Sequence, residues 1–526
     1  MRVLSKVLSV RTSVIALAVA MATVGHADLA HAETLADAIT AAYQSNPNIQ
    51  AQRAAMRALD ENYTQARSAY GLQASAQVSE NYTWQKFGRL PSEEGTAQTN
   101  QLAVSQSLYT NGRYAARLGG IEAQIKASRE NLRRIEMDLL VRVTSAYVSV
   151  RRDREVLRIS RGGEAWLAQQ LQDTQDKYSV RTVTLTDVQQ AKARLAQAST
   201  QVANAQAQLN VSVANYGAII GHLPDTLEPE PDIDGLPTSL DEAFNEAEQS
   251  NPVLTASLFT EQASRLGVAE ARAQRLFSVS ARADYSNGPA SGTRVAPSTR
   301  FDSVTAGVTL TQPLFSSGQL NSSVRQSIEE NNRDKLLIED ARRNMVLGVS
   351  QYWDNLVAAR RTLVTIEDEM KADRIAFLGV REEERFALRS TIEVLNAQAE
   401  LQNAQLNFVR GRTLEYVGRL QLLAQVGTLE VGNLAPDVQP YDPARHFKKV
   451  RYKGMLPTDL IVQALDHVAL PLAAKKPKPG DTTPIRPPSS ELPAAPVPAD
   501  KVTPPPAINE LPPLTDDAPV RTSPKG

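Results

Sequence analysis

The 526-residue sequence predicts a mainly α-helical fold with membrane-spanning β-strands, built from a tandem duplication. Three observations predict it. Sequence motifs recur in the same order at a nearly constant offset, which is the mark of an internal repeat. Two segments in each half alternate between apolar and polar residues, and each half also carries long stretches with helical periodicity.

The N-terminal segment reads as a secretory signal. Three basic residues flank or precede the apolar run 13–24, which is too short to span a bilayer as a stable helix. Small residues, Ala30 and Ala32, stand where a signal peptidase needs them, so we expect residues 1–32 to be removed before Glu33. A membrane anchor that is never cut is the alternative interpretation.

Composition excludes several functions. The chain has no cysteine, which rules out disulfides, thiolate metal sites, a cysteine nucleophile and a lipid-anchored N-terminal cysteine. A net charge of -1 gives no reason to expect a nucleic-acid partner. Beyond the signal, the three histidines His222, His446 and His467 lie far apart, and no HExxH, GxSxG, P-loop or dinucleotide-binding motif occurs. We therefore expect no enzyme activity, no cofactor and no metal.

The duplication divides the chain into a first repeat, residues 33–221, a linker, 222–238, and a second repeat, 239–427. Four pairs of matching segments lie about 205 residues apart. They are 35–38 and 240–243, 45–47 and 250–252, 106–109 and 312–315, and 188–195 and 394–401.

Each repeat is expected to contain one β-hairpin, at residues 72–110 and 276–315. Apolar side chains at 304, 306, 308 and 310 alternate with polar ones at 303, 305, 309 and 311, and residues 72–87 behave alike. This period of two indicates strands with one apolar and one polar face.

A long helix and then a second helix are expected to follow each hairpin. Residues 112–179 contain no proline, and their apolar residues recur at spacings of three, four and seven. Residues 195–216 show a coiled-coil seam with small residues. A helix of nearly 70 residues is about 100 Å long, which suits a coiled-coil tube or rod rather than a compact domain.

The C-terminal part differs in composition. Residues 471–526 hold sixteen of the 30 prolines and are expected to form a tail that is disordered or polyproline-like. Residues 428–470 are expected to form a partly ordered equatorial or peripheral segment packed outside the tube.

Four amphipathic strands cannot close a barrel, and unpaired strand edges are not tolerated in the hydrocarbon layer. Three chains would supply twelve strands, an even number of the kind found in outer-membrane barrels. The sequence therefore predicts a trimeric 12-stranded outer-membrane β-barrel continued by a long α-helical tunnel. A soluble β-sandwich with helices is the alternative, but it explains neither the helix length nor the duplication.

Nearly all of residues 33–427 resembles the TolC family of outer-membrane efflux and type I secretion channels. The resemblance rests on residues 178–180 (YSV), 186–189 (TDVQ) and 393–397 (EVLNA), with the SNP segments and the strand exits. It implies a homotrimer with a barrel in outer-membrane lipid and a tunnel in the periplasm. It also implies two partners, a periplasmic adaptor protein and an inner-membrane ABC or RND transporter.

The resemblance also implies a gate at the periplasmic turns. Thr186 and Asp187 would hold one side, and Phe386 and Arg389 the other, with Arg389 paired to Asp187. The family usually has tyrosine where this chain has Phe386, so a hydroxyl bond to Asp187 is unavailable.

Glu393 and Asn396 take the places of the paired aspartates that ring the aperture in this family. Asn396 is neutral, so the ring would carry half the charge. The side chains expected to dock the adaptor are those of the two tips. They are Val180, Arg181, Thr182, Leu388 and Ser390, and the usual Val-Gly pair is absent from both tips. The plainer interpretation of all these polar residues is a solvated helix end.

Two other functions remain open at this point. A periplasmic adaptor would carry one coiled-coil hairpin and a β-rich domain, whereas a structural rod would not need polar-faced strands. The sequence does not identify the cargo, which the transporter selects.

Overall fold

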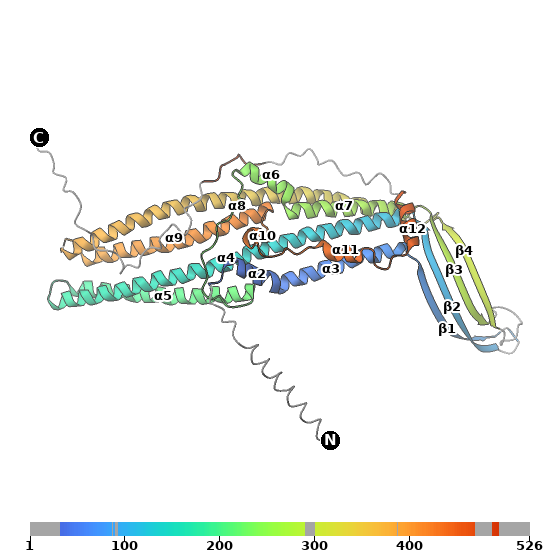
Figure 1. Ribbon diagram of the computed structural model, residues 1–526, viewed down its shortest axis with the longest axis horizontal. Helices are drawn as coiled ribbons and strands as arrows, with labels where there is room; N and C mark the ends of the chain where they lie inside the picture. The colour runs from blue at the N-terminus through green and yellow to red at the C-terminus, as the bar shows by residue number, and fades with distance from the viewer. Residues whose placement is uncertain are drawn as a thin grey trace, which may run out of the picture.

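The structure, a computed structural model, describes residues 32–86, 88–89, 93–289, 300–386, 388–468 and 486–493. These residues form an elongated body of helices with a four-stranded sheet at one end (Figure 1). The predicted signal peptide, apart from Ala32, lies outside the described residues. In chain order the elements are α2 (Leu35–Ser45), α3 (Pro47–Arg67), the 3-10 helix η1 (Ser68–Tyr70), β1 (Gln73–Gln85), β2 (Glu93–Tyr109), α4 (Arg113–Ser179), α5 (Leu185–Ile220), α6 (Leu240–Ser250), α7 (Pro252–Ala273), β3 (Ser278–Pro289), β4 (Arg300–Thr311), α8 (Gln319–Arg385), α9 (Thr391–Val426), α10 (Val431–Leu434), α11 (Ala444–Val450) and α12 (Pro457–Val468).

The duplication is visible in the helix lengths. α4 and α8 each have 67 residues, and α5 and α9 each have 36. At about 1.5 Å per residue, the longer helices are about 100 Å long. α4 packs along α5, and α8 packs along α9, so each repeat contributes one long helical hairpin (Figure 1).

The four strands form one antiparallel sheet in the order β1-β2-β3-β4. Each repeat supplies one hairpin, as the alternating pattern predicted. The pairing of β2 with β3 joins the repeats, with Leu102 opposite Tyr285 and Val104 opposite Ala283. Within the described residues, β1 and β4 each have a neighbour on one side only.

Glycine is required where each hairpin passes into its long helix. Gly112 and Gly318 precede α4 and α8 with φ of 81° and 85°, the left-handed region that strains other residues. This backbone conformation explains why a glycine recurs at the same position in both repeats, just before the long helix.

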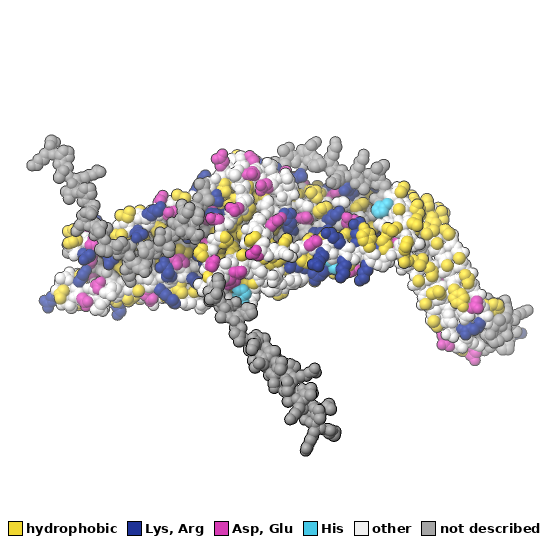
Figure 2. All heavy atoms as spheres, viewed as in Figure 1, with side chains coloured by type: hydrophobic (Ala, Val, Ile, Leu, Met, Phe, Trp, Pro, Cys, Tyr) yellow, Lys and Arg dark blue, Asp and Glu magenta, His cyan; other side chains and the backbone are white. Residues whose placement is uncertain are grey.

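Every residue of β4 is exposed, including Val304, Val308 and Leu310 of its apolar face. Hydrophobic side chains are spread over the strand end of the molecule in Figure 2. An exposed apolar surface of this extent is typical of contact with lipid or with another chain. The mainly helical fold with amphipathic strands is therefore as predicted.

Residues 428–468 carry the short helices α10, α11 and α12, which are spread along the helical body. α10 packs against α2, but α11 packs along α3, and α12 contacts β2 and α4 at the base of the sheet (Figure 1). Phe447 of α11 lies edge-to-face on Tyr63, with ring centroids 5.0 Å apart. α11 and α12 thus lie at the periphery of the helical body, where their apolar residues pack against α3 and the strand-to-helix junction.

Asp466 of α12 fixes that junction. Its buried carboxylate accepts the backbone N–H groups of Thr110, Gly112 and Ala115 at 2.8, 3.0 and 3.2 Å. It also accepts the hydroxyls of Thr110 and Tyr70. Gly112 is the N-cap of α4 and Ala115 lies in its first turn, and since the Gly112 N-cap has no side chain, Asp466 of α12 supplies the cap.

The prediction of disorder for residues 471–526 was wrong for one short stretch. Residues 486–493 lie against α6 and α8 and form a β-bridge between Glu491 and Ser239. Specific backbone and side-chain contacts hold this stretch in place, which its proline-rich composition did not reveal. The rest of the predicted tail lies outside the described residues.

Candidate functional site at the tip of the helical body

The end of the helical body opposite the sheet carries both predicted turns (Figure 1). α4 ends at Ser179 and α5 begins at Leu185. In the second repeat α8 ends at Arg385 and α9 begins at Thr391. Residues predicted to form the gate, the aperture ring and the docking tips all lie in these turns or in the first helical residues after them.

The first turn is closed by its own backbone. The N–H and hydroxyl of Thr182 both donate to the carbonyl of Lys177, at 3.0 and 2.8 Å. Arg181 adopts the left-handed region with φ of 61°, which is uncommon for a residue with a side chain. The predicted docking residues Val180, Arg181 and Thr182 are consequently all exposed.

Asp187 starts α5. Its Oδ2 accepts the backbone N–H and the hydroxyl of Thr184, both at 2.8 Å, while Thr184 accepts the N–H of Asp187 in return. This reciprocal arrangement is a capping box, which satisfies N–H groups that a helix start leaves unpaired. Thr186, the other predicted gate residue of this repeat, is exposed.

Glu393 plays the same part in the second repeat. Its Oε2 accepts the N–H and hydroxyl of Ser390 at 2.8 and 2.9 Å, and this capping box starts α9. The backbone N–H of Ser390 lowers the pKa of Glu393 to about 2, helped by the Ser390 hydroxyl and the Arg389 guanidinium. Glu393 is therefore a capping carboxylate as well as a predicted ring residue.

Arg389 pairs within its own hairpin. Its Nε lies 2.7 Å from Glu383 and its Nη1 lies 2.9 Å from Glu393. The expected pair with Asp187 is not formed within the described chain. Two carboxylates closer along the hairpin already hold the guanidinium, and the Asp187 carboxylate is engaged by Thr184.

Two polar contacts that the sequence analysis missed join the repeats at the tip. Lys177 Nζ lies 2.5 Å from Glu384 Oε1, which links α4 to α8. Arg194 donates to Asn396 Oδ1 at 3.0 Å, which links α5 to α9. The charges of Lys177 and Glu384, at the ends of equally long helices, were the available signal. Sequence alone did not show which helix faces meet.

An apolar cluster lies beside these contacts. The rings of Trp166 in α4 and Phe377 in α8 pack edge-to-face, with centroids 5.6 Å apart. Ala191, Val394 and Leu395 are buried in the same cluster. The repeats are therefore held together near the tip by a small core, with the polar pairs at its margin.

Phe386 and Leu388 project from the second turn and are 74% and 73% exposed. Phe386 thus makes no gate contact of the expected kind within the described chain. Large apolar side chains at an exposed turn indicate a surface that another protein or copy covers. Ser390, the remaining predicted docking residue, is also exposed.

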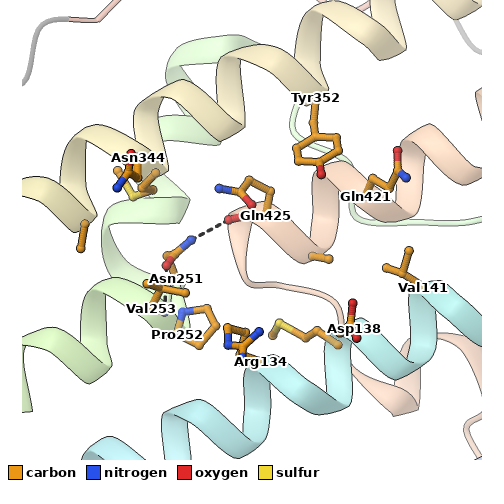
Figure 3. Close-up of a pocket in the computed structure, with 14 residues that line it drawn as sticks. Arg134, Asp138, Val141, Asn251, Pro252, Val253, Asn344, Tyr352, Gln421 and Gln425 are labelled. Carbon is orange, nitrogen blue, oxygen red and sulfur yellow. Dashed lines mark hydrogen bonds between the residues drawn. The ribbon is translucent and has the colours of Figure 1, made fainter.

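A cavity of about 410 Å³ lies between α4 and the second repeat, near the middle of the body (Figure 3). Asn251, which caps α7, donates to the carbonyl of Gln425 at its edge at 2.7 Å. Arg134 and Asp138 of α4 also line the cavity, as does Tyr352 of α8. Residues of both repeats line the cavity, so it lies at the interface between the two repeats.

The described residues contain no cluster of three or more histidine and acidic side chains arranged to hold a metal ion. None of the helices in this part of the chain has the length and apolarity needed to cross a membrane.

Comparison with known proteins gives a consistent result. The family described as outer membrane efflux protein matches residues 38–222 and 243–428, one match for each repeat. The outer membrane efflux protein BepC of Brucella suis is 28% identical over 80% of this chain and 91% of its own length. The outer membrane protein TolC of Vibrio cholerae is 24% identical over 76% of this chain and 91% of its own length.

The fold is shared with solved channels. The CmeC outer membrane channel of Campylobacter jejuni is 12% identical and superposes with a TM-score of 0.68, covering 79% of this chain and 89% of that one. The family match covers both repeats and most of the described residues. This chain belongs to the outer membrane efflux protein family.

Proposed function

We propose that three copies of the chain assemble into the passive exit duct of a tripartite efflux or type I secretion system. The observation that carries the proposal is the four-stranded antiparallel sheet at the end of two helices of 67 residues. Its outer strands each have one neighbouring strand among the residues that the structure describes. The protein is an outer-membrane channel of its family, with its helical part in the periplasm.

Closure of the barrel follows from hydrogen bonding. The outer edges of β1 and β4 present backbone groups that hydrocarbon cannot satisfy. Pairing β1 of one copy with β4 of the next, three times, uses all of these edges and gives twelve strands. The apolar residues of β4 would then face lipid, and its serine and threonine residues would face the lumen.

The helical body supplies the rest of the path. Six long helical hairpins, two from each copy, would continue the barrel as a tunnel across the periplasm. The duct needs no cofactor and no catalytic group, since the transporter supplies the energy and selects the cargo.

The protein works with an efflux or secretion complex, as its family does. We propose that a periplasmic adaptor docks on the tips formed by Val180, Arg181, Thr182, Leu388 and Ser390, and that an ABC or RND transporter lies beyond it. The exposure of all five side chains supports this assignment.

The gate at the tip is proposed in a revised form. Lys177–Glu384 and Arg194–Asn396 tie the hairpin of one repeat to that of the other, so parting the hairpins breaks both contacts. An exposed ion pair contributes only about 0.2–1 kcal/mol. A latch of this strength, repeated three times, can be opened by a docking partner.

Thr186, Asp187, Phe386 and Arg389 have a different part in this revised gate. Asp187 and Arg389 hold the helix turns in shape, whereas Thr186 and Phe386 are free to contact a neighbouring copy. Three copies of Glu393, with Asn396 one turn further on, would form the aperture ring.

Purification from the outer-membrane fraction, followed by native mass spectrometry, tests the assembly. We expect a particle with three times the mass of the mature chain. A monomer recovered from the periplasm would favour the adaptor function instead. Pull-down of the intact protein from membranes would identify the transporter.

A further inference from the structure

The proline-rich C-terminal stretch 486–493 crosses the second repeat as an extended strand. The N–H of Leu240 donates to the carbonyl of Ser490 at 3.0 Å, and the N–H of Leu492 donates to the carbonyl of Thr238 at 3.2 Å. These two bonds pair the stretch antiparallel to the residues that open α6. Residues 490–492 and 238–240 therefore form a short antiparallel β-bridge.

Two buried donors of α8 are satisfied by this stretch. The indole N–H of Trp353, a side chain with no exposed surface, donates to the hydroxyl of Ser490 at 2.7 Å. Arg360, which is 5% exposed and also binds Glu415, donates to the carbonyl of Pro493 at 2.6 Å. A buried donor without a partner is costly, so these two groups favour an occupied surface.

The ends of the stretch are held by further contacts. Arg486 donates to Asn245 at 3.0 Å, pairs with Glu248 at 3.2 Å and lies over the ring of Phe244 at 5.3 Å. Leu492 packs against the buried cluster of α6, α8 and α9. Residues 486–493 are thus held by an ion pair, by apolar packing and by backbone hydrogen bonds.

The duplication provides an internal comparison. Two positions of α8 that receive the stretch have counterparts in α4 206 residues earlier (353 - 147 and 360 - 154), Trp353 with Tyr147 and Arg360 with Arg154. Ser239, the N-cap of α6, corresponds to Thr34, the N-cap of α2, 205 residues earlier (239 - 34) and next to Glu33. The same surface therefore exists twice in the chain.

In the first repeat the linker 222–238 covers this surface. The N–H of Glu33 donates to Thr226, and the hydroxyl of Tyr147 donates to the carbonyls of Glu33 and Glu228 at 2.8 Å. Arg154 donates to the carbonyl of Pro224 at 3.2 Å, as Arg360 does to Pro493. The bridge there is parallel rather than antiparallel, so the surface accepts extended chain in either direction.

We propose that the surface formed by Thr238, Trp353 and Arg360, here called the second-repeat slot, is a peptide-binding site whose ligand is residues 486–493 of the same chain. The first repeat is followed by a linker that fills its slot. After the second repeat, residues 486–493 fill the second-repeat slot in the corresponding way. Recognition is mainly through the backbone, with Ser490, Leu492 and Arg486 adding side-chain contacts.

Covalent connection through residues 469–485 makes the binding intramolecular, with an effective concentration on the order of millimolar. The slot of the intact protein is therefore filled, and a free copy of the octapeptide should not enter it. Weakening the tail's own contacts should open the slot to the free peptide. This inference does not depend on the channel function.

Protease protection tests the docking in the full-length, detergent-solubilised protein. Glutamyl endopeptidase cleaves after Glu491, whose backbone is paired with Ser239. Ser490→Ala, which leaves the Trp353 indole N–H without its acceptor, should raise the cleavage rate there about tenfold. Ser489→Ala is the matched control, because Ser489 is exposed and makes no hydrogen bond to the described residues.

Binding in trans provides the second readout. A fluorescein-labelled peptide of residues 485–494 should bind the full-length Leu492→Asp protein, detected by fluorescence anisotropy, and should not bind the wild-type protein. The same peptide carrying Leu492→Asp should bind neither. Equal cleavage of the Ser490→Ala, Ser489→Ala and wild-type proteins would overturn the proposal, as would failure of the peptide to bind Leu492→Asp protein that remains folded by circular dichroism.

Discussion

Lys177 of α4 and Glu384 of α8 form an ion pair of 2.5 Å between the two repeats, at the ends of helices of equal length. Glu384 is the more buried of the two, with 11% of its side chain exposed against 40% for Lys177. Among the described residues Arg389, by contrast, pairs with Glu383 and Glu393 of its own hairpin. The contacts that resist parting of the repeats are therefore different from those that shape each turn.

Breaking the contacts between the repeats should open the channel. Lys177→Met combined with Asn396→Ala removes the charged contact and the acceptor of Arg194, so the closed tip loses its polar links. Single-channel conductance in a planar lipid bilayer should rise. Arg385→Gln is the matched control, because Arg385 pairs with Glu382 of the same helix and its loss should leave conductance unchanged.

The Glu393 cap should depend on pH in a defined window. Its pKa is lowered from 4.5 to about 2, so the ionised carboxylate stabilises the turn fully above pH 4.5. That contribution is lost as the pH falls from 4.5 through about 2. Amide hydrogen exchange of the turn should be faster in Glu393→Gln than in wild type at pH 5, and the difference should shrink towards pH 2.

A matched control for the cap is Glu400→Gln, an exposed position further along α9. It should leave exchange of the turn unchanged at every pH. Equal exchange in wild type and Glu393→Gln at pH 5 would show that the carboxylate does not hold the turn.

The same residue should affect ion selectivity. Three Glu393 carboxylates around an aperture attract cations, so Glu393→Gln should shift the reversal potential in a salt gradient towards lower cation preference. Asp368→Asn, which removes an exposed charge elsewhere on α8, is the control. Identical reversal potentials for Glu393→Gln and wild type would place the constriction at other residues.

The two faces of β4 should respond differently to charge. Val308→Arg would set a charge on the proposed lipid face, at a cost of about 2–4 kcal/mol near the midplane. Thr309→Arg would point into the lumen and should be milder. The yield of trimer after refolding into lipid measures both, and equal losses would mean that the facing is assigned wrongly.

The strand-to-helix junction should depend on Asp466. Asp466→Ala leaves several buried donors at the start of α4 without an acceptor, each costing on the order of 1–3 kcal/mol. The thermal midpoint of the trimer should fall. Asp437→Ala, an exposed position before α11, serves as the control and should leave the midpoint unchanged.

The hairpins and the long helices could be predicted from the periodic pattern of apolar residues in the sequence. The glycines at 112 and 318, the alternation around Val308 and the uninterrupted helical stripe after Gly112 each reflect a local rule of backbone geometry. The duplication reinforced every one of these assignments, because each pattern occurred twice.

The contacts that could not be predicted from the sequence are those between segments that lie far apart in the chain. The pairing of Lys177 with Glu384 needs the rotation of two long helices about their axes, which a periodic pattern leaves open. Asp466 and Ser490 bind Thr110 and Trp353, which lie 356 and 137 residues away in the sequence, and both belong to segments judged by composition alone. Arg389 was assigned to Asp187 by resemblance, and nearer carboxylates took its place.

Conductance of the purified protein in a planar lipid bilayer decides whether the chain forms a duct. The wild-type protein should show discrete, trimer-dependent openings of low conductance, as expected for a duct whose tip is latched. Bilayers that stay silent after verified insertion of the protein, in wild type and in the Lys177→Met, Asn396→Ala variant alike, would contradict the proposed duct.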